Sequence, residues 1–215
     1  MKRSKIWPIY ELVGMKLLRM RFRWPVGLLL WLLLVGIGYA WLLRYDLTAG
    51  GALAAPRSIP AWLSGAPDSA GSQLVIALHP RCPCSRATLR ELAKILTRAP
   101  GTADVTVLMF IPRNAEEEWM EGALLTEARR LNCRIQPDYG GELAASLGSL
   151  TSGGVALYDS HGRLRYQGGI TVSRGHEGDN AGELAVIEIL RGGASHHESL
   201  PVFGCPIRAG TEPAL

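Results

Sequence analysis

Hydrophobic and polar positions divide the chain into one long apolar run and a later region where short apolar runs alternate with amphipathic segments. Residues 24–43 are twenty residues without a charge. At a rise of about 1.5 Å per residue they span about 30 Å, the thickness of a hydrocarbon core. Basic residues precede this run and only Arg44 follows it closely, so the positive-inside rule predicts a cytoplasmic segment 1–23 and an exported remainder.

A cleaved signal peptide is the alternative interpretation of this run, because Ala52-Leu53-Ala54 has the small-residue pattern of a cleavage site. The apolar stretch is long for the core of a signal peptide, and the small-residue site lies about ten residues beyond it. The pattern therefore favours an uncleaved transmembrane anchor, residues 24–43, in a single-pass protein of the inner membrane.

Residues 44–72 are rich in Ala, Gly, Pro and Ser and are predicted to be a linker, with Trp62 and Leu63 able to dock on the domain. We expect the folded domain at 73–193 and a C-terminal tail at 194–215. Apolar periodicity within the domain predicts strands at 73–78, 105–111, 133–136, 154–158 and 163–167, and helices at 86–98, 115–131, 141–147 and 181–191. This order predicts an α/β fold with a mixed central sheet and helices on both faces.

The positive charge of the chain belongs mainly to its N-terminal segment. Seven of the 23 basic residues, but only one of the 19 acidic residues, fall within residues 1–23. The remainder is slightly acidic and lacks the basic excess that a nucleic-acid-binding domain carries. The sequence therefore predicts a membrane partner and no nucleic-acid partner.

Two cysteines lie in the loop Cys82-Pro83-Cys84 between the first strand and the first helix. A helix N-terminus stabilises a thiolate through its unpaired N–H groups and its dipole, and Arg81, Arg86 and His79 are expected to add positive charge nearby. The alternative is a pair of buried or structurally bridged cysteines.

The other two cysteines are Cys133 and Cys205, and four cysteines allow three complete pairings. Cys205 lies in an apolar patch, residues 202–207, of an otherwise polar tail, which indicates that the tail packs back on the domain. We expect Cys205 to approach the Cys82/Cys84 loop as a resolving thiol, a partner in a structural disulfide or a third metal ligand. Cys133 is expected to be a small buried residue.

The element order, with Cys-Pro-Cys before the first helix, resembles the thioredoxin-like superfamily, and more closely its membrane-tethered periplasmic and peroxiredoxin branches. The resemblance covers about residues 73–192 and includes the hairpin run from Leu157 to Gly162. It implies a thioredoxin-like sheet, with Cys82 as nucleophile. It places Ser85 at the family's second cysteine, and Ser152 and Gly153 in the partner-binding loop, where the family's cis-proline is absent.

The resemblance also places the polar, glycine-rich loop 168–180 near Cys82. In that loop His176 is a candidate proton shuttle or ligand, Glu177 a candidate to orient it, and Arg174 a candidate to hold a thiolate or carboxylate. With Arg81, Ser85, Ser152 and Gly153, the residues Arg174 and Glu177 form the expected substrate-binding set.

These observations predict a membrane-anchored, periplasmic thiol–disulfide oxidoreductase that acts on an extracytoplasmic client or redox partner without a cofactor. Its expected catalytic residues are Cys82, Cys84, Cys205 and His176. One alternative is a copper(I)-binding assembly factor with the same four residues as ligands, since thiolates and imidazole suit soft copper(I). Another is a non-catalytic binding module. The peroxidase run Pro-x-x-x-Thr-x-x-Cys, which the resemblance would imply for a peroxidase, is absent before Cys82.

Overall fold

The computed structural model describes residues 9–64 and 71–207, with side chains described in 24–63 and 71–207. The chain divides into two compact units, residues 1–45 and residues 46–215. The first unit is almost entirely the long helix α1 (Ile9–Leu47). Its part from Trp24 to Leu47 has a mean hydropathy of 2.3 and is long and apolar enough to cross a membrane. The predicted span 24–43 lies inside this helix, whereas the first eight residues of the basic segment 1–23 lie outside the described residues.

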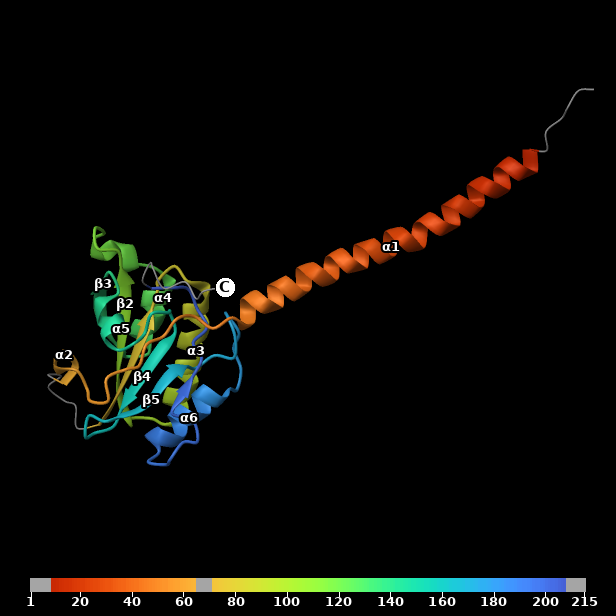
Figure 1. Ribbon diagram of the computed structural model, residues 1–215. Helices are drawn as coiled ribbons and strands as arrows, with labels where there is room; N and C mark the ends of the chain where they lie inside the picture. Colours follow the sequence, from red (N-terminus) through yellow and green to blue (C-terminus); the bar gives the residue numbers. More distant parts are fainter. Residues whose placement is uncertain (1–8, 65–70, 208–215) are drawn as a thin grey trace, which may run out of the picture. The chain divides into compact units, whose positions relative to one another are not determined.

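The second unit is built on one six-stranded mixed sheet with the strand order β3-β2-β1-β4-β5-β6 (Figure 1). The first three strands are parallel, β4 runs antiparallel to both β1 and β5, and β6 is parallel to β5. The strands are β1 (Ser72–Leu78), β2 (Ala103–Ile111), β3 (Arg134–Tyr139), β4 (Gly154–Tyr158), β5 (Leu164–Gly169) and β6 (Ser199–Leu200).

Helices cover both faces of the sheet, as predicted, because alternate side chains of each strand point to opposite faces. Leu74, Ile76 and Leu78 of β1 pack in the larger core cluster with α3, α4 and α6. Val75 and Ala77 of the same strand pack in a second cluster, with α2 and α5. The helices are α2 (Ala61–Ser64), α3 (Pro83–Arg98), α4 (Ala123–Arg130), α5 (Glu142–Ser146) and α6 (Ala181–Leu190), with the 3-10 helix η1 (Glu117–Met120) before α4.

One expectation about the elements is wrong. The helix expected at 115–131 is two pieces, η1 and α4, because Gly122 has φ +145°, which no helix accepts. The linker 44–72 packs on the domain at Ala52 and Ser58, which form β-bridges with Ser149 and Arg163. The tail packs back on the domain, as its apolar patch indicated, and supplies β6. Both extended segments satisfy backbone groups at the edge of the domain that would otherwise face water.

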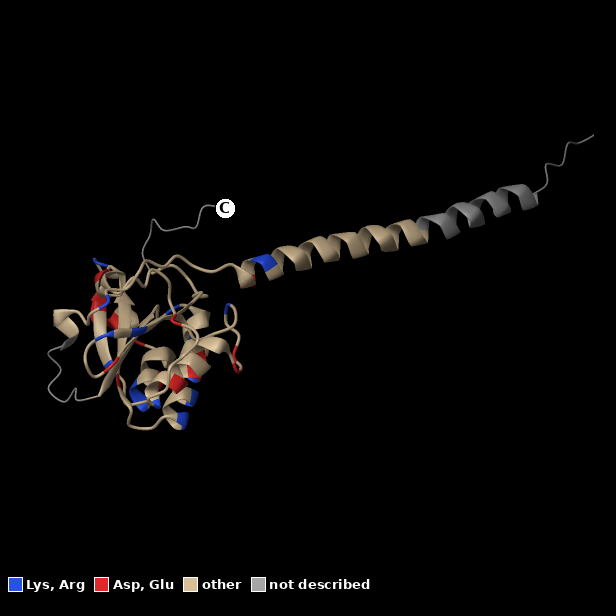
Figure 2. Cartoon of the chain, turned by 60° about the horizontal axis from the view of Figure 1, so that its bottom comes forward, with Lys and Arg blue, Asp and Glu red and all other residues tan. Residues whose placement is uncertain are grey.

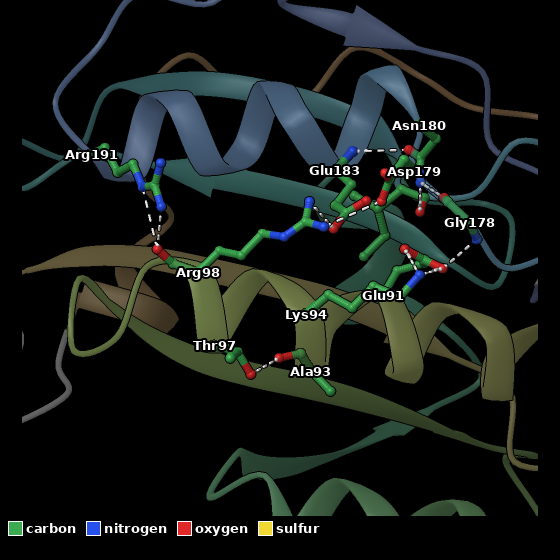
Figure 3. A network of polar contacts seen from close by, with 11 residues as sticks. Glu91, Ala93, Lys94, Thr97, Arg98, Gly178, Asp179, Asn180, Glu183 and Arg191 are labelled. Carbon is green, nitrogen blue, oxygen red and sulfur yellow. Dashed lines mark hydrogen bonds and ion pairs between the residues drawn. The ribbon is translucent and has the colours of Figure 1, made fainter.

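A polar network fastens the loop after β5 to α3 (Figure 3). The guanidinium of Arg98 bonds Glu183 at 3.2 Å and Asp179 at 3.3 Å, and the buried Glu91 accepts from Gly178 N at 2.8 Å. Asn180 is the N-cap of α6, and its side chain accepts from Glu183 N at 2.9 Å. Glu91 also pairs with Lys94 at 2.9 Å. The network therefore holds the end of the loop 168–180 and the start of α6 against α3.

Basic and acidic residues are interspersed along the elements of the second unit in the view of Figure 2. The described apolar part of α1 carries its charge only near its C-terminal end, at Arg44 and Asp46. This distribution agrees with a positive charge balance that arises from the N-terminal segment.

Candidate active site

Cys82 lies where the sequence placed it, at the start of the first helix of the domain. It is the N-cap residue of α3, with extended backbone angles, and Pro83 is the first helical residue. Proline suits that position because the first N–H of a helix has no partner inside the helix. The peptide N–H of Cys82 donates to His79 O at 3.0 Å, which turns the chain from β1 into α3. The turn thus presents Cys82 to the free N–H groups of the helix.

The two thiols of the Cys-Pro-Cys loop are buried, as the alternative interpretation of a buried pair expected. Cys82 is 4% exposed and Cys84 is 9% exposed. Neither residue belongs to the two hydrophobic core clusters. The cover over Cys82 includes the C-terminal tail, because Cys205 Sγ lies 2.9 Å from Cys82 Sγ. The expected approach of Cys205 to the cysteine loop is confirmed.

All three thiols are free. Hydrogen bonds from the thiol of Cys205 and then from that of Cys84 lower the pKa of Cys82, backbone N–H groups of the same two residues act in the same direction, and burial opposes them. Contact with Cys205 and then with Cys82 raises the pKa of Cys84, and contact with Cys82 raises the pKa of Cys205, in both cases together with burial. These contacts favour the thiolate at Cys82 over a thiolate at the other two sulfur atoms, and the thiolate is the form needed for nucleophilic attack.

A serine pair supports the cysteine loop from the side of β4. Ser152 Oγ accepts from His79 N at 3.0 Å and lies 2.7 Å from Ser85 Oγ, which itself donates to His79 O at 2.8 Å. Since the hydrogen of Ser85 is used on His79, the hydroxyl of Ser152 donates to Ser85. Both serine side chains are fully buried beneath the loop and the tail, so their hydroxyl groups position the loop. The expectation that Ser85 and Ser152 belong to the substrate-binding set stays a prediction.

Gly153 occupies the place where the resemblance expected a cis-proline loop. It has φ +94°, and a Cβ there would lie 2.9 Å from Thr88 Oγ1. Its N–H donates to Ala77 O at 2.7 Å, and the described residues contain no cis peptide bond. Glycine therefore lets the loop pass close to α3, and the neighbouring N–H of Ser152 faces the tail, donating to Cys205 O at 2.9 Å.

Aromatic residues that the sequence analysis did not single out flank the opposite side of the loop. The ring of His79 stacks on Phe110, with centroids 5.2 Å apart, and meets Trp119 edge-on at 5.3 Å. The guanidinium of Arg81 lies 4.5 Å from the centre of the Trp119 ring. Burial is the largest influence on His79 and lowers its pKa, Cys82 opposes this effect and Arg81 adds to it, so burial acts against the positive charge expected of His79.

The loop 168–180 contributes Arg174 to the site, and Glu177 does not orient His176 as expected, while the role of His176 stays a prediction. Arg174 donates to Gly204 O, next to Cys205, and its charge lowers the pKa of Cys205 against the other influences. Glu177 pairs with Arg90 at 2.5 Å instead of orienting His176. His176 is exposed, and its Nδ1 contacts Arg174 O at 2.9 Å.

Metal binding was predicted only as an alternative, through Cys82, Cys84, Cys205 and His176. In the described parts of the chain, no three His, Cys, Asp or Glu residues form a group that could hold a metal ion. The three sulfur atoms fit soft copper(I) by their chemistry. The copper(I) alternative stays a prediction that requires His176 or another ligand to join them.

The chain runs from β1 through α3 to the parallel strand β2, and later forms the β4–β5 hairpin and α6. Cys82 stands at the start of α3, which packs beside α6. That is the arrangement of thioredoxin. The fold is thioredoxin-like.

Comparisons with known structures agree with this fold. A hypothetical protein from Sinorhizobium meliloti matches with a TM-score of 0.53 and 24% identity, over 77% of this chain and 97% of that chain. An uncharacterised conserved protein from Geobacillus kaustophilus matches with a TM-score of 0.52 and 17% identity, over 79% and 95% of the two chains. A secreted disulfide oxidoreductase of Mycobacterium tuberculosis is more distant, with a TM-score of 0.36 and 16% identity over 55% and 80%. No protein-family model and no curated protein matches the sequence.

Proposed function

We propose that the protein is a membrane-anchored, extracytoplasmic thiol–disulfide oxidoreductase, with Cys82 as nucleophile and Cys205 as resolving thiol. The observation that carries the proposal is the 2.9 Å approach of the two sulfur atoms at the start of α3. A small shift brings them to the bonding distance of about 2.05 Å. The two residues are 123 positions apart in the sequence, so only the fold makes them a pair.

The reaction is an exchange of two electrons. The Cys82 thiolate attacks one sulfur of a client disulfide, forms a mixed disulfide, and releases the other client sulfur as a thiolate that takes up a proton. Cys205 then loses its proton and attacks the Cys82 sulfur, which expels the second client thiol and leaves a Cys82–Cys205 disulfide. The client is reduced by two electrons and the enzyme is oxidised by two. A second redox partner restores the two thiols by the same steps in reverse.

Cys84 supports this chemistry as a hydrogen-bond donor to the Cys82 thiolate. Its raised pKa keeps it protonated, and a bridge between Cys82 and Cys84 would close a very small ring. Arg174, by favouring the thiolate of Cys205, lowers the barrier to its attack. Cys84 therefore stabilises the Cys82 thiolate before its attack on the client, and Arg174 assists the later attack by Cys205.

The anchor supports an extracytoplasmic location for the domain, since the basic segment 1–23 precedes the span. Disulfide exchange is productive in an oxidising compartment of this kind, such as the periplasm. The proposed clients are proteins with disulfides that reach the outer surface of the inner membrane.

The test uses the full-length protein in detergent and a model disulfide, 5,5′-dithiobis(2-nitrobenzoate). Cys205→Ser, Cys84→Ser and Cys82→Ser are compared, with Cys133→Ala as the matched control because Cys133 belongs to the hydrophobic core. The proposal predicts a stable mixed adduct on Cys82 in Cys205→Ser, and an internal disulfide with release of both aromatic thiols in Cys84→Ser. No adduct at Cys82 in any variant would overturn it. Stoichiometric copper binding without exchange would favour the copper(I) alternative.

A further inference from the structure

The tail segment 204–207, Gly-Cys-Pro-Ile, lies on the domain next to the active-site loop and is held there by an isolated β-bridge and its flanking hydrogen bonds. Thr151 and Pro206 form an antiparallel β-bridge. On either side of the bridge, Ser152 N donates to Cys205 O at 2.9 Å and Ile207 N donates to Leu150 O at 2.9 Å. The backbone of residues 150–152 therefore forms a short binding edge, and the tail segment 204–207 pairs with this edge.

Side-chain contacts also fix the position of this segment, in addition to its backbone hydrogen bonds. Ile207 is buried in the core cluster of the second face, among Val75, Ala77 and Ala144. At the other end, a Cβ on Gly204 would collide with the carbonyl oxygen of Ser152, so the residue before the cysteine must be glycine. Arg174 bonds the carbonyl oxygen of Gly204. The slot thus selects glycine, then cysteine, then an apolar residue two positions later.

The segment delivers its cysteine to the nucleophile. With Gly204 and Ile207 seated, Cys205 Sγ lies 2.9 Å from Cys82 Sγ, and Cys82 is 4% exposed. A disulfide client must bring its own sulfur to the same place, which the tail fills. Occupation by the tail and occupation by a client are therefore mutually exclusive.

We propose that residues 204–207 are an internal surrogate of the client, and that the client is an extended segment with a half-cystine, which replaces the tail along residues 150–152. Antiparallel pairing gives such a segment affinity whatever its sequence, and the pockets around it give selectivity. This inference rests on the proposed function and names its substrate class. After the mixed disulfide has formed, the returning tail brings Cys205 to Cys82 and displaces the client, so that resolution and release are one event.

The test measures access to Cys82 in the full-length Cys84→Ser/Cys205→Ser protein. Adding Gly204→Ala drives the tail from the slot, because the new methyl group meets Ser152 O. Gly71→Ala is the matched control, since Gly71 precedes β1 and its Cβ would make only ordinary contact with Thr102 O at 3.6 Å. Ile207→Ala is a second way to loosen the tail, and near-ultraviolet circular dichroism verifies that each variant is folded.

The probe is a synthetic peptide with the sequence of residues 200–207, its cysteine activated as a mixed disulfide with 2-nitro-5-thiobenzoate. Its transfer to Cys82 is expected to be about tenfold faster or more in Gly204→Ala, because the two backbone hydrogen bonds of the tail no longer compete. The Gly71→Ala control should not change the rate. A peptide with alanine before its cysteine should lose this gain, because it meets the same Ser152 oxygen.

Two results overturn the inference. One is a rate of peptide transfer that stays equal to that of the Cys84→Ser/Cys205→Ser parent in both Gly204→Ala and Ile207→Ala. The other is an alanine peptide that reacts as fast as the glycine peptide, which would make the tail a simple cover. Either result leaves the proposed function standing if 5,5′-dithiobis(2-nitrobenzoate) still reacts at Cys82. If that small reagent fails too, the proposed function itself is wrong.

Discussion

Replacing Cys205 with alanine tests the electrostatics of the site most directly. The hydrogen bond from its thiol is the largest cause of the lowered pKa of Cys82, followed by the bond from Cys84. A hydrogen bond to a charged group contributes about 1.5–3 kcal/mol. One pKa unit corresponds to about 1.4 kcal/mol, so Cys205→Ala should raise the pKa of Cys82 by about one to two units. Cys84→Ala should raise it by less.

The assay is the rate of iodoacetamide alkylation at Cys82 against pH, followed by mass spectrometry of the intact chain. Because the variant also uncovers Cys82, the midpoint of the profile is compared and not the absolute rate. Cys133→Ala is the control, since burial raises the pKa of Cys133 to about 11 and removes it from the measured range. A wild-type midpoint at the ordinary thiol value of about 8.5, or no shift in Cys205→Ala, would refute the reasoning.

Two further predictions concern the support of the site. Ser152→Ala should lower the free energy of unfolding by about 1–3 kcal/mol in urea titrations, because it leaves the buried N–H of His79 without its acceptor. Ser160→Ala, in an exposed turn, should change it by less than about 0.5 kcal/mol; equal effects would argue against the serine pair. Burial raises the pKa of Glu183, so the stability it contributes is present below its ordinary pKa and is lost as pH rises through its folded-state pKa. The Tm of Glu183→Gln should therefore fall less than that of the wild type between acidic and neutral pH. Parallel curves of Tm against pH for the two proteins would contradict this.

Local signals predicted most of the fold. The apolar run became β1 because five consecutive apolar residues, 74–78, suit a strand buried on both faces. The start of α6 at 181 also follows from a local signal, because the capping bond from Glu183 N to Asn180 joins residues only three positions apart. The helix expected at 115–131 failed where a single glycine, Gly122, interrupts an otherwise helical pattern.

The site depends on contacts that no local pattern encodes. The apolar residues around Cys205 indicated that the tail packs on the domain, but its partner Cys82 is 123 positions away. Ser152 became a buried support because three segments converge on its hydroxyl and its N–H. Trp119 was missed because it lies in an acidic segment that is typical of a solvent-exposed helix, although its ring contacts Arg81. Each of these depends on how the sheet brings distant loops together.

The linker takes part in the same arrangement, which relates the redox state to opening of the slot. Gly50 N donates to Val202 O at 2.8 Å, and Arg174 bonds both Thr48 O of the linker and Gly204 O of the tail. A client that displaces the tail must break these bonds together with those to residues 150–152. Oxidation requires only a small shift of two sulfur atoms, and the resulting bond between Cys82 and Cys205 would hold the tail in the slot. In the proposed exchange, the tail therefore leaves the slot more easily before the bond between Cys82 and Cys205 has formed than after it.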